Sequence, residues 1–344
     1  MKILYSEAHL LHVPHREFEG APPSLAAHPE LPSRAEMILA ALKQRGYGPV
    51  LGPRLPLRRE LEAVHSAELL DFLEGFCSRD FAGAEEVVAD AFALHAWRSA
   101  GKPRSLLWRF GLFCFDPQTP LQPGSWQAAL GAAGCAVRGA ELLHGGETAV
   151  YALCRPPGHH AGRGFFGGYC YLNNAAVAAA SLGAGGGRVA ILDLDFHHGN
   201  GTQEIFYEAP EVLYVSLHAD PNEAYPYYSG YSDETGEGSG SGTNLNFPLP
   251  RRCDEHRYRE ALAEALAAIE GFAPRFLVVS LGTDILSQDP VGGMGMSVEG
   301  FGRLGEAVRT LDLPTLIVQE GGYAVEAIGD CVCSFLAPWD GSGR

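Results

Sequence analysis

Acidic and imidazole side chains alternate in the segment DLDFHHGNG, where Asp193, Asp195 and His197 stand two residues apart. In an extended chain this spacing places all three side chains on one side. A further aspartate, Asp284, lies far along the sequence in GTDILSQDP. A single aspartate or histidine more often caps a helix or satisfies a buried hydrogen bond, but two carboxylates with one imidazole suit zinc or a neighbouring first-row metal. Three protein ligands leave a coordination position open for water, so the pattern predicts a hydrolytic metal site.

Four polar clusters each follow an apolar, β-branched run that is typical of a buried parallel strand. In open parallel sheets, ligands bind beyond the carboxyl ends of the strands, where loops converge and helix N-termini contribute positive dipoles. The clusters are therefore expected to meet at one site. They are RPPGHHA after Val150 to Cys154, DLDFHHGNG at the end of Val189 to Leu194, GTDILSQDP after Phe276 to Leu281, and EGGY after Thr315 to Val318.

Strand-like and helix-like segments alternate along most of the chain, which predicts an α/β fold with a central parallel sheet flanked by helices. Two more strands are expected at Lys2 to Tyr5 and at Val212 to Leu217. The stretches with helical spacing are Trp126 to Leu143, Asn174 to Leu182, Glu255 to Ile269 and Val298 to Leu311.

Three other segments carry local signals. Ser33 and Glu36 have the spacing of a capping box at a helix start. Residues 81–123 show weak periodicity, and we interpret them as an insertion. Residues 220–250 are expected to form a loop because GEGSGSGTNLNFPLP is rich in glycine, and the loop is expected to pack near a pocket through Tyr225, Tyr227 and Tyr228. With no internal repeat and no clean break, we expect a single domain over residues 1–344.

The composition is typical of a globular protein, since 46% of the 344 residues are hydrophobic and 19% are charged. No apolar stretch approaches the roughly 20 residues that span a bilayer. The eight cysteines show neither zinc-knuckle spacing nor a disulfide framework. We therefore expect a cytoplasmic protein with no membrane partner. The net charge of −16 repels phosphate backbones, so nucleic acid is not an expected partner.

The motifs RPPGHHAG, GGYCYLNNAA, DLDFHHGNGTQ, VSLHAD and EGGY resemble the histone deacetylase and acetylpolyamine amidohydrolase family, in its bacterial acetylpolyamine branch. The resemblance covers nearly the whole chain and implies an arginase-like fold, a single α/β domain around a parallel sheet. It implies a zinc-dependent deacetylase that hydrolyses N-acetyl or other short N-acyl amides of amines. It also implies a homodimer in which the insertion at 81–123 forms the interface and narrows the cleft.

The same resemblance assigns one catalytic zinc per chain to Asp195, His197 and Asp284, and it places His159 and His160 beside the reacting water. Zinc lowers the pKa of its water, and an imidazole can take the proton and return it to the leaving amine. We expect His160 to be this base and His159 to act mainly electrostatically.

Supporting roles follow for Asp193, which would hold His159, and for Asn200, which would hold His160. Some relatives carry Asp in place of this Asn, so His160 is expected to be less strongly biased towards the cation here. Two coupled imidazoles titrate as a unit, so their roles are shared.

Three more features are implied by the resemblance. Tyr323 in EGGY would donate a hydrogen bond to the developing oxyanion. Asp289 resembles a supporting acid of the family, which we expect behind the metal or the histidine pair. A structural potassium ion would be surrounded by oxygen atoms of Asp193, Asp195, His197, Ser216 and Leu217.

The substrate is expected to be a small N-acylated amine. Leu107 and Gln118 stand where the acetylpolyamine branch carries two rim acids, with only Asp116 nearby. We therefore expect neutral or singly charged acyl amides to be favoured over long acetylated polyamines. The residues expected to contact the substrate are Tyr169 and Tyr225, whose rings would pack against methylene groups, with Gly168, Gln118 and Asp116.

Three other functions stay open. A protein or peptide acyl-lysine deacylase would use the same zinc chemistry. An arginase-like binuclear manganese hydrolase would need further carboxylates, yet Gly199 and Gly282 occupy the positions two residues from His197 and Asp284. A non-catalytic binder of acylated ligands would lack a metal ligand, the base or the tyrosine, and all of these are present.

Overall fold

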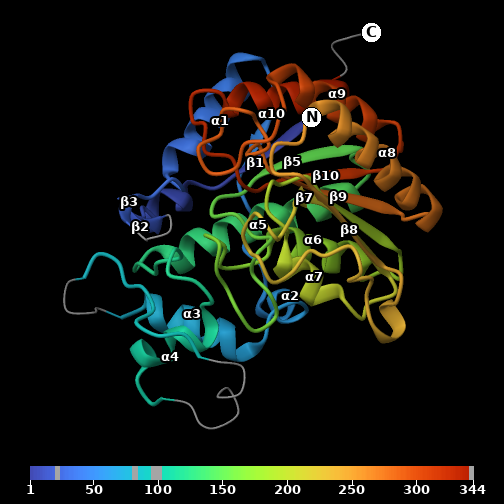
Figure 1. Ribbon diagram of the computed structural model, residues 1–344. Helices are drawn as coiled ribbons and strands as arrows, with labels where there is room; N and C mark the ends of the chain where they lie inside the picture. The colour runs from blue at the N-terminus through green and yellow to red at the C-terminus, as the bar shows by residue number, and fades with distance from the viewer. Residues whose placement is uncertain (20–23, 80–83, 94–102, 341–344) are drawn as a thin grey trace.

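Eight strands form one central sheet in the computed structural model, which describes residues 1–19, 24–79, 84–93 and 103–340. Their order is β4-β1-β5-β10-β9-β6-β7-β8, and every neighbouring pair is parallel (Figure 1). A short antiparallel pair, β2 (Arg16–Glu19) and β3 (Ser24–Ala27), stands apart from the sheet. The sheet strands are β1 (Lys2–Tyr5), β4 (Val50–Leu51), β5 (Ala149–Leu153), β6 (Val189–Asp193), β7 (Val212–Ala219), β8 (Asn244–Leu249), β9 (Phe276–Leu281) and β10 (Thr315–Gln319).

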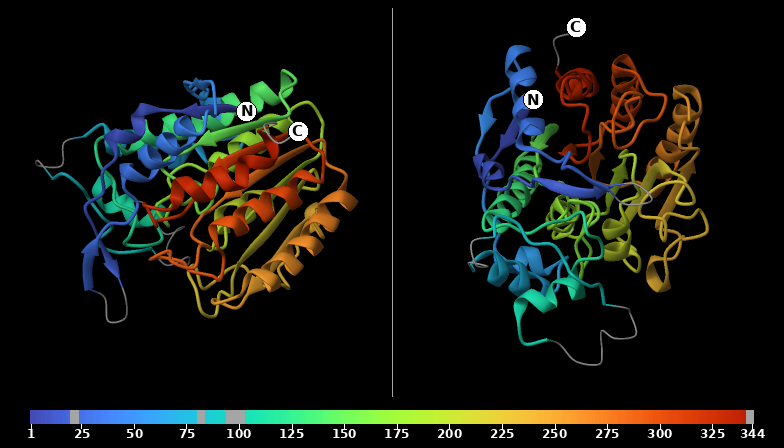
Figure 2. Two further views of the ribbon diagram at one scale, coloured as in Figure 1. Left: turned by 90° about the horizontal axis from the view of Figure 1, so that it is seen from above. Right: turned by 60° about the vertical axis from the view of Figure 1, so that its left-hand side comes forward.

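Helices cover both faces of this sheet, which gives three layers (Figure 2). One face packs against α1 (Pro32–Gln44), α8 (Glu255–Phe272), α9 (Val298–Arg309) and α10 (Ile328–Leu336). The other face packs against α5 (Ser125–His144), α6 (Asn174–Gly183) and α7 (Asn200–Phe206). Farther from the sheet, α3 (Ala67–Cys77) packs against α5, α4 (Leu106–Phe113) against α3, and α2 (Arg58–Glu62) against α6. Among the described residues, no helix combines the length and the apolar character needed to cross a membrane.

Side chains of each strand alternate between the two cores, as the pleat of a strand requires. In β9, Val278 packs into the core beneath α5 and α6, while Val279 packs into the core beneath α8 and α9. Both faces are apolar, which explains why the strand sequences read as continuous hydrophobic runs. The expected α/β fold is confirmed: the six predicted strands are β1, β5, β6, β7, β9 and β10, and the four predicted helices are α5, α6, α8 and α9.

The helix that Ser33 and Glu36 indicated is present as α1, but two local details were wrong. Helix α1 begins at Pro32, its N-cap is Leu31, and no side chain caps it, so Ser33 lies inside the helix. Proline suits the first helical position because its fixed φ angle matches the helix and its missing N–H needs no partner there. The second error is β8, which lies within the segment expected to be a loop. It pairs with β7 as the last strand of the sheet, an edge position where Pro248 costs no ladder hydrogen bond.

The described part of the expected insertion belongs to the hydrophobic core rather than to a separate appendage. Helix α4 packs against α3, and Phe110 and Phe113 are buried beside Phe72. Leu107 also packs against this core. Residues 81–83 and 94–102 of the predicted insertion lie outside the described residues, and the dimer interface stays a prediction.

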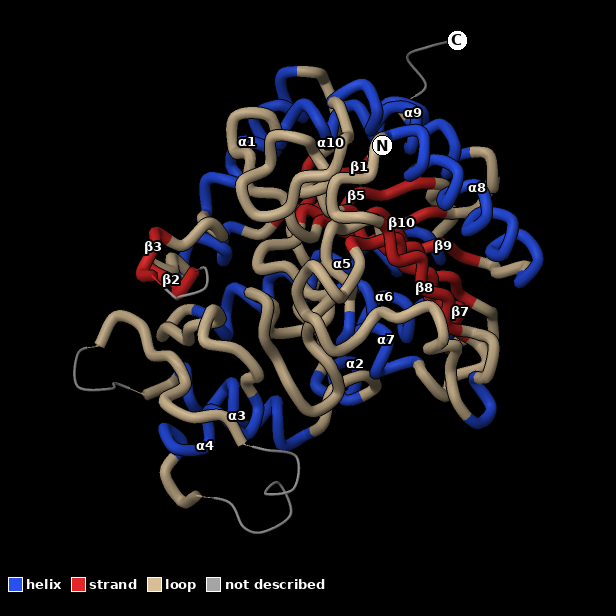
Figure 3. The backbone as a smooth tube through the Cα atoms, viewed as in Figure 1, coloured by secondary structure: helices blue, strands red, loops and turns tan. Residues whose placement is uncertain are grey.

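All eight sheet strands run in the same direction, so their carboxyl ends meet at one edge. Figure 3, which colours strands red and loops tan, shows long loops gathered at one end of the strands. The loops that follow β5, β6, β9 and β10 carry the four polar clusters. The topology therefore brings those clusters to the same edge of the sheet.

Candidate active site

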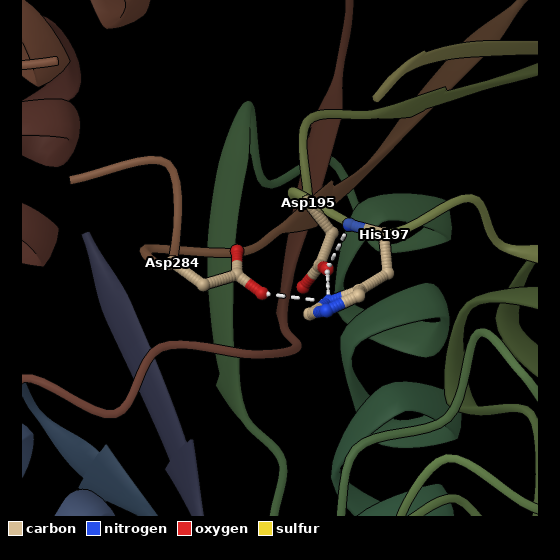
Figure 4. Close-up of side chains that lie close together, drawn as sticks. All are labelled: Asp195, His197 and Asp284. Atoms are coloured by element: carbon tan, nitrogen blue, oxygen red, sulfur yellow. Dashed lines mark hydrogen bonds and ion pairs between the residues drawn. The ribbon is translucent and has the colours of Figure 1, made fainter. Parts of the chain in front are cut away.

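Asp195 and His197 follow β6, and Asp284 follows β9, the strand paired with β6. Their ligand atoms all lie within 4.8 Å of one another. His197 Nδ1 is 3.2 Å from Asp195 Oδ1 and 3.1 Å from Asp284 Oδ2 (Figure 4). Both aspartates are fully buried. The structure thus brings together the three residues that the sequence predicted as metal ligands.

Electrostatics at this point favour a cation. Burial and the neighbouring charge of Asp195 raise the pKa of Asp284 to about 7. Burial lowers the pKa of His197, but the two carboxylates outweigh it and raise that pKa to about 9. Two carboxylate oxygens and one imidazole nitrogen facing a common point form a donor set that zinc accepts. The residues present therefore fit a single metal ion.

A second metal ligand has no room beside Asp195. A Cβ atom added at Gly282 would overlap the Asp195 carboxylate, so an acidic side chain at that position could not be accommodated without movement of the backbone. Gly321 is similarly tight, because a Cβ atom there would lie 2.6 Å from carboxylate oxygens of both Asp195 and Asp284. The packing therefore disfavours the binuclear arrangement.

The two histidines of RPPGHH lie next to the proposed metal ligands, with ring centroids 4.0 Å apart. His159 Nδ1 is 3.2 Å from Asp193 Oδ2, and its Nε2 is 3.7 Å from Asp195 Oδ1. Burial lowers the pKa of His159, but Asp195 and Asp193 outweigh it and raise that pKa to about 10. The carboxylates of Asp195 and Asp193 therefore favour the imidazolium form of His159, and Asp193 is its hydrogen-bond partner.

His160 has the opposite environment. Its Nδ1 lies 2.7 Å from Asn200 Oδ1, at the start of α7. With the amide oxygen accepting, Nδ1 donates, and the lone pair of Nε2 is left for a proton. Burial, followed by the charges of His159 and His197, lowers the pKa of His160 well below its usual value. A neutral imidazole with a free lone pair is what a general base requires.

Tyr323 lies in the loop after β10 and is 7% exposed. The Arg34 guanidinium lies over the Tyr323 ring, 4.7 Å from its centroid, and Arg34 also donates to the carbonyl of Gly322. The phenol lines the same cavity as His160 and His197. A hydroxyl there can donate to an oxygen of a bound amide.

Asp289 supports the tyrosine loop. A place behind the metal or the histidine pair stays a prediction for Asp289, whose carboxylate accepts hydrogen bonds from main-chain amides of two loops. These belong to Tyr323, Ala324, Val291 and Gly292. A carboxylate that accepts four N–H groups fixes the two loops to each other.

A cavity of about 650 Å³ leads to these groups, and Tyr169 and Tyr225 form part of its wall. Gly168 has a φ of 56°, and a Cβ atom at this position would overlap the ring of His160, so only glycine fits. Asp116 braces the wall, since its Oδ2 accepts from the Tyr225 hydroxyl at 2.7 Å and from the Gly168 amide at 2.5 Å. Asp116 is therefore engaged with protein groups at the channel wall.

Gln118 also lines the cavity, as expected, but Leu107 does not, because it packs in the core. An acid that the sequence analysis missed is Glu17, on β2, whose carboxylate accepts from the Tyr169 hydroxyl at 2.6 Å. Glu17 is 6% exposed and lines the cavity. Its segment REFE carries no motif, and only the three-dimensional position of the β2–β3 hairpin reveals it.

Comparison with known proteins agrees with this geometry. Residues 28–338 match the family model of the histone deacetylase domain. The chain belongs to this family. It is 42% identical to acetylpolyamine amidohydrolase 1 of Pseudomonas aeruginosa over 100% of both chains, and 41% identical to the acetylpolyamine amidohydrolase of Mycoplana ramosa over 98% of both. The crystal structure of acetylpolyamine aminohydrolase from Burkholderia pseudomallei has a TM-score of 0.93 at 38% identity, covering 99% of each chain.

As a member of the histone deacetylase domain family, the protein is a hydrolase of the deacetylase type. Family membership implies a zinc site, and the buried Asp195, His197 and Asp284 supply a suitable group of ligands. The fold also agrees with that of its solved relative along almost the whole chain.

Proposed function

We propose that this protein is an amidohydrolase that removes acetyl groups from small N-acetylated amines, with one zinc ion held by Asp195, His197 and Asp284. The main support is that these three ligand residues lie together, and that His197 lines one cavity with His160 and Tyr323. The names of similar proteins, acetylpolyamine amidohydrolases, favour a small acetylated amine as the substrate.

The chain's own residues divide the reaction between them. A zinc ion held by Asp195, His197 and Asp284 would supply polarisation of the amide carbonyl and acidification of a water molecule. His160 takes a proton from the attacking water through Nε2 and returns it to the leaving amine. His159 keeps its charge through Asp193 and stabilises negative charge nearby. Tyr323 donates a hydrogen bond to the carbonyl oxygen as negative charge develops on it.

The cavity supports a short substrate with one distal ammonium group. Glu17 contributes a carboxylate to the wall, where it accepts from the Tyr169 hydroxyl at 2.6 Å, and Asp116 is engaged with Tyr225 and the Gly168 amide. The rings of Tyr169 and Tyr225 offer apolar surface for a methylene chain. A monoacetylated diamine therefore matches the lining better than a long polycation does.

Two further proposals concern the assembly. A potassium ion would bind where the Asp193 carboxylate, the Ser216 hydroxyl and the carbonyls of Asp195, His197 and Leu217 supply hard oxygen ligands. Asp193 and Ser216 pair in register on β6 and β7, and both are fully buried. A homodimer is proposed from the resemblance to the acetylpolyamine branch.

The test is hydrolysis by the zinc-loaded protein of acetylputrescine, acetylspermidine, acetylspermine, a neutral N-alkylacetamide and an acetyl-lysine peptide. We expect the highest kcat/KM for acetylputrescine. In the Glu17→Gln variant, kcat/KM for acetylputrescine should fall about tenfold, while kcat/KM for the neutral amide should not change. A clear preference for the peptide would replace the proposal by an acyl-lysine deacylase, and no hydrolysis of any compound would refute the amidohydrolase.

A further inference from the structure

Glu320 is a buried carboxylate that the reaction outlined above does not use. It follows β10, the strand that lies between β5 and β9 in the sheet. Its Oε2 accepts from the main-chain amide of Gly158 at 2.7 Å and from that of His159 at 3.2 Å. Its Oε1 lies 3.2 Å from the hydroxyl of Ser280 on β9. The side chain is fully buried, so these contacts are made without competition from bulk water.

We propose that Glu320 is a positioning residue, which fixes the main chain of the histidine pair so that both imidazoles face the metal ligands. This inference rests on the proposed deacetylation, because its effect is read through His159 and His160. Glu320 belongs to the EGGY motif, but it acts on the RPPGHH motif across the boundary between two neighbouring strands.

The main chain at His159 is held from two sides. From the α7 side, the amides of Gly201 and Thr202 both donate to the His159 carbonyl at 3.1 Å. From the β10 side, Glu320 accepts from the amides of Gly158 and His159. Without the carboxylate, two buried N–H groups would lose their acceptor, and a buried unpaired amide drives local rearrangement.

The local packing leaves little tolerance for such a rearrangement. A Cβ atom at Gly158 would lie 2.5 Å from the main-chain nitrogen of Asn174, so this part of the loop is already in close contact with the start of α6. Any shift towards new hydrogen-bond acceptors would therefore carry the imidazoles of His159 and His160 with it. Misplacement of catalytic groups by about 1 Å can lower a rate by about 100-fold.

The contacts require an acceptor oxygen at this position rather than a net charge. Burial raises the pKa of Glu320 to about 7, with Asp193 adding to the effect and His159 opposing it. Either protonation state offers a carbonyl-type oxygen to the two amides. A glutamine can do the same, whereas an aspartate is one methylene shorter and cannot reach both amides from the same backbone position.

The experiment compares Glu320→Gln, Glu320→Asp and Glu320→Ala, with metal content, kcat and KM measured for acetylputrescine. We expect Glu320→Gln to keep kcat within about threefold of the unmodified protein. Glu320→Asp and Glu320→Ala should lose between about 10-fold and 100-fold in kcat with little change in KM and with one zinc per chain retained. Glu60→Ala is the control, because Glu60 also accepts from a main-chain amide but lies outside the cavity lining; its kinetics should not change.

Normal kcat in metal-loaded Glu320→Ala would overturn the inference. Equal losses in Glu320→Gln and Glu320→Ala would also overturn it, because the charge and not the acceptor geometry would then matter. If Glu320→Ala does not fold, Glu320→Asp takes its place in both comparisons. Normal kcat in Glu320→Asp, or equal losses in Glu320→Gln and Glu320→Asp, would then overturn the inference. Failure of the unmodified protein to hydrolyse any acetylated amine would instead refute the proposed function.

Discussion

Two adjacent imidazoles in this site have opposite charge preferences because their partners differ. His159 lies against the Asp193 carboxylate, which favours its cation, whereas His160 lies against the neutral amide of Asn200 and beside the ring of His159. A base must be unprotonated to act, so the neutral ring is the one suited to accept a proton. The division of labour between the histidines therefore follows from Asp193 and Asn200.

Replacement of Asn200 by aspartate should move the pH dependence of the reaction. A carboxylate in place of the Asn200 amide, which lies 2.7 Å from Nδ1, favours the imidazolium form and raises the pKa of His160. Because the protonated ring cannot act as the base, the acid limb of the kcat/KM profile should shift to higher pH. The measurement is kcat/KM from about pH 5 to pH 9 for both proteins. An unchanged acid limb would mean that another group controls it.

The Tyr323→Phe substitution should lower kcat by about 100-fold or more and leave metal content unchanged, since one oxyanion donor is worth roughly 3 kcal/mol. Phenylalanine keeps the ring contact with the Arg34 guanidinium, which lies 4.7 Å from the centroid. Steady-state kinetics and metal analysis of the same preparation separate the loss of the hydrogen bond from a loss of metal. Turnover at the normal rate would show that Tyr323 only forms part of the channel wall and does not act in the reaction.

The sequence was most informative for residues whose chemistry is visible in a short motif. Asp195, His197, Asp284 and the histidine pair meet as expected, because each motif follows a strand of one parallel sheet. Glu17 could not be found in this way, because no motif surrounds it and its place depends on where the antiparallel pair of β2 and β3 lies. Asp289 and Glu320 lie in recognised motifs, but their partners are main-chain amides of other loops.

At the scale of the elements, buried strands were predictable because both faces are apolar and leave a continuous hydrophobic run. The edge strand β8 was not, since NLNFPL is only partly buried and follows a glycine-rich segment. Helix α1 shows a similar limit: a serine with the right spacing did not cap it, and Leu31 and Pro32 form its start. Local signals are ambiguous where tertiary contacts decide the boundary.

A buried ion cluster links α1 to the segment after β5. Glu30 Oε1 lies 2.7 Å from Arg34 Nη1 and 2.9 Å from Arg155 Nε, and all three side chains are at most 2% exposed. Glu30→Ala would leave two guanidinium groups buried without their carboxylate, which should lower the free energy of unfolding by about 3–5 kcal/mol. Chemical denaturation monitored by circular dichroism measures the change.

The control for that measurement is Glu147→Ala, which removes the partly exposed pair with Lys2. Such a pair contributes at most about 1 kcal/mol to the free energy of unfolding, so the denaturation curve should shift little. Equal stability of Glu30→Ala and the unmodified protein would show that the buried arginines find other partners and that the cluster is not essential to the fold.

At the scale of the whole molecule, the net charge of −16 acts over a longer range than the carboxylates of the cavity. Salt screens charges beyond a distance of about 10 Å, while a direct contact inside the cavity is screened less. Added salt should therefore lower kcat/KM for acetylspermine but leave a neutral acetamide of similar length unchanged. Neutral and singly charged amides should remain the better substrates at moderate salt. A tenfold preference for acetylspermine that survives added salt would contradict the proposal that the substrate is short and singly charged.

The central claim is that one metal ion, held by Asp195, His197 and Asp284, supports hydrolysis. Metal analysis of the active protein, combined with titration of zinc into metal-free protein, tests it most directly. We expect one zinc per chain, full activity after about one equivalent, and loss of both in Asp284→Ala. Two metal ions per chain, with activity dependent on both, would contradict the account.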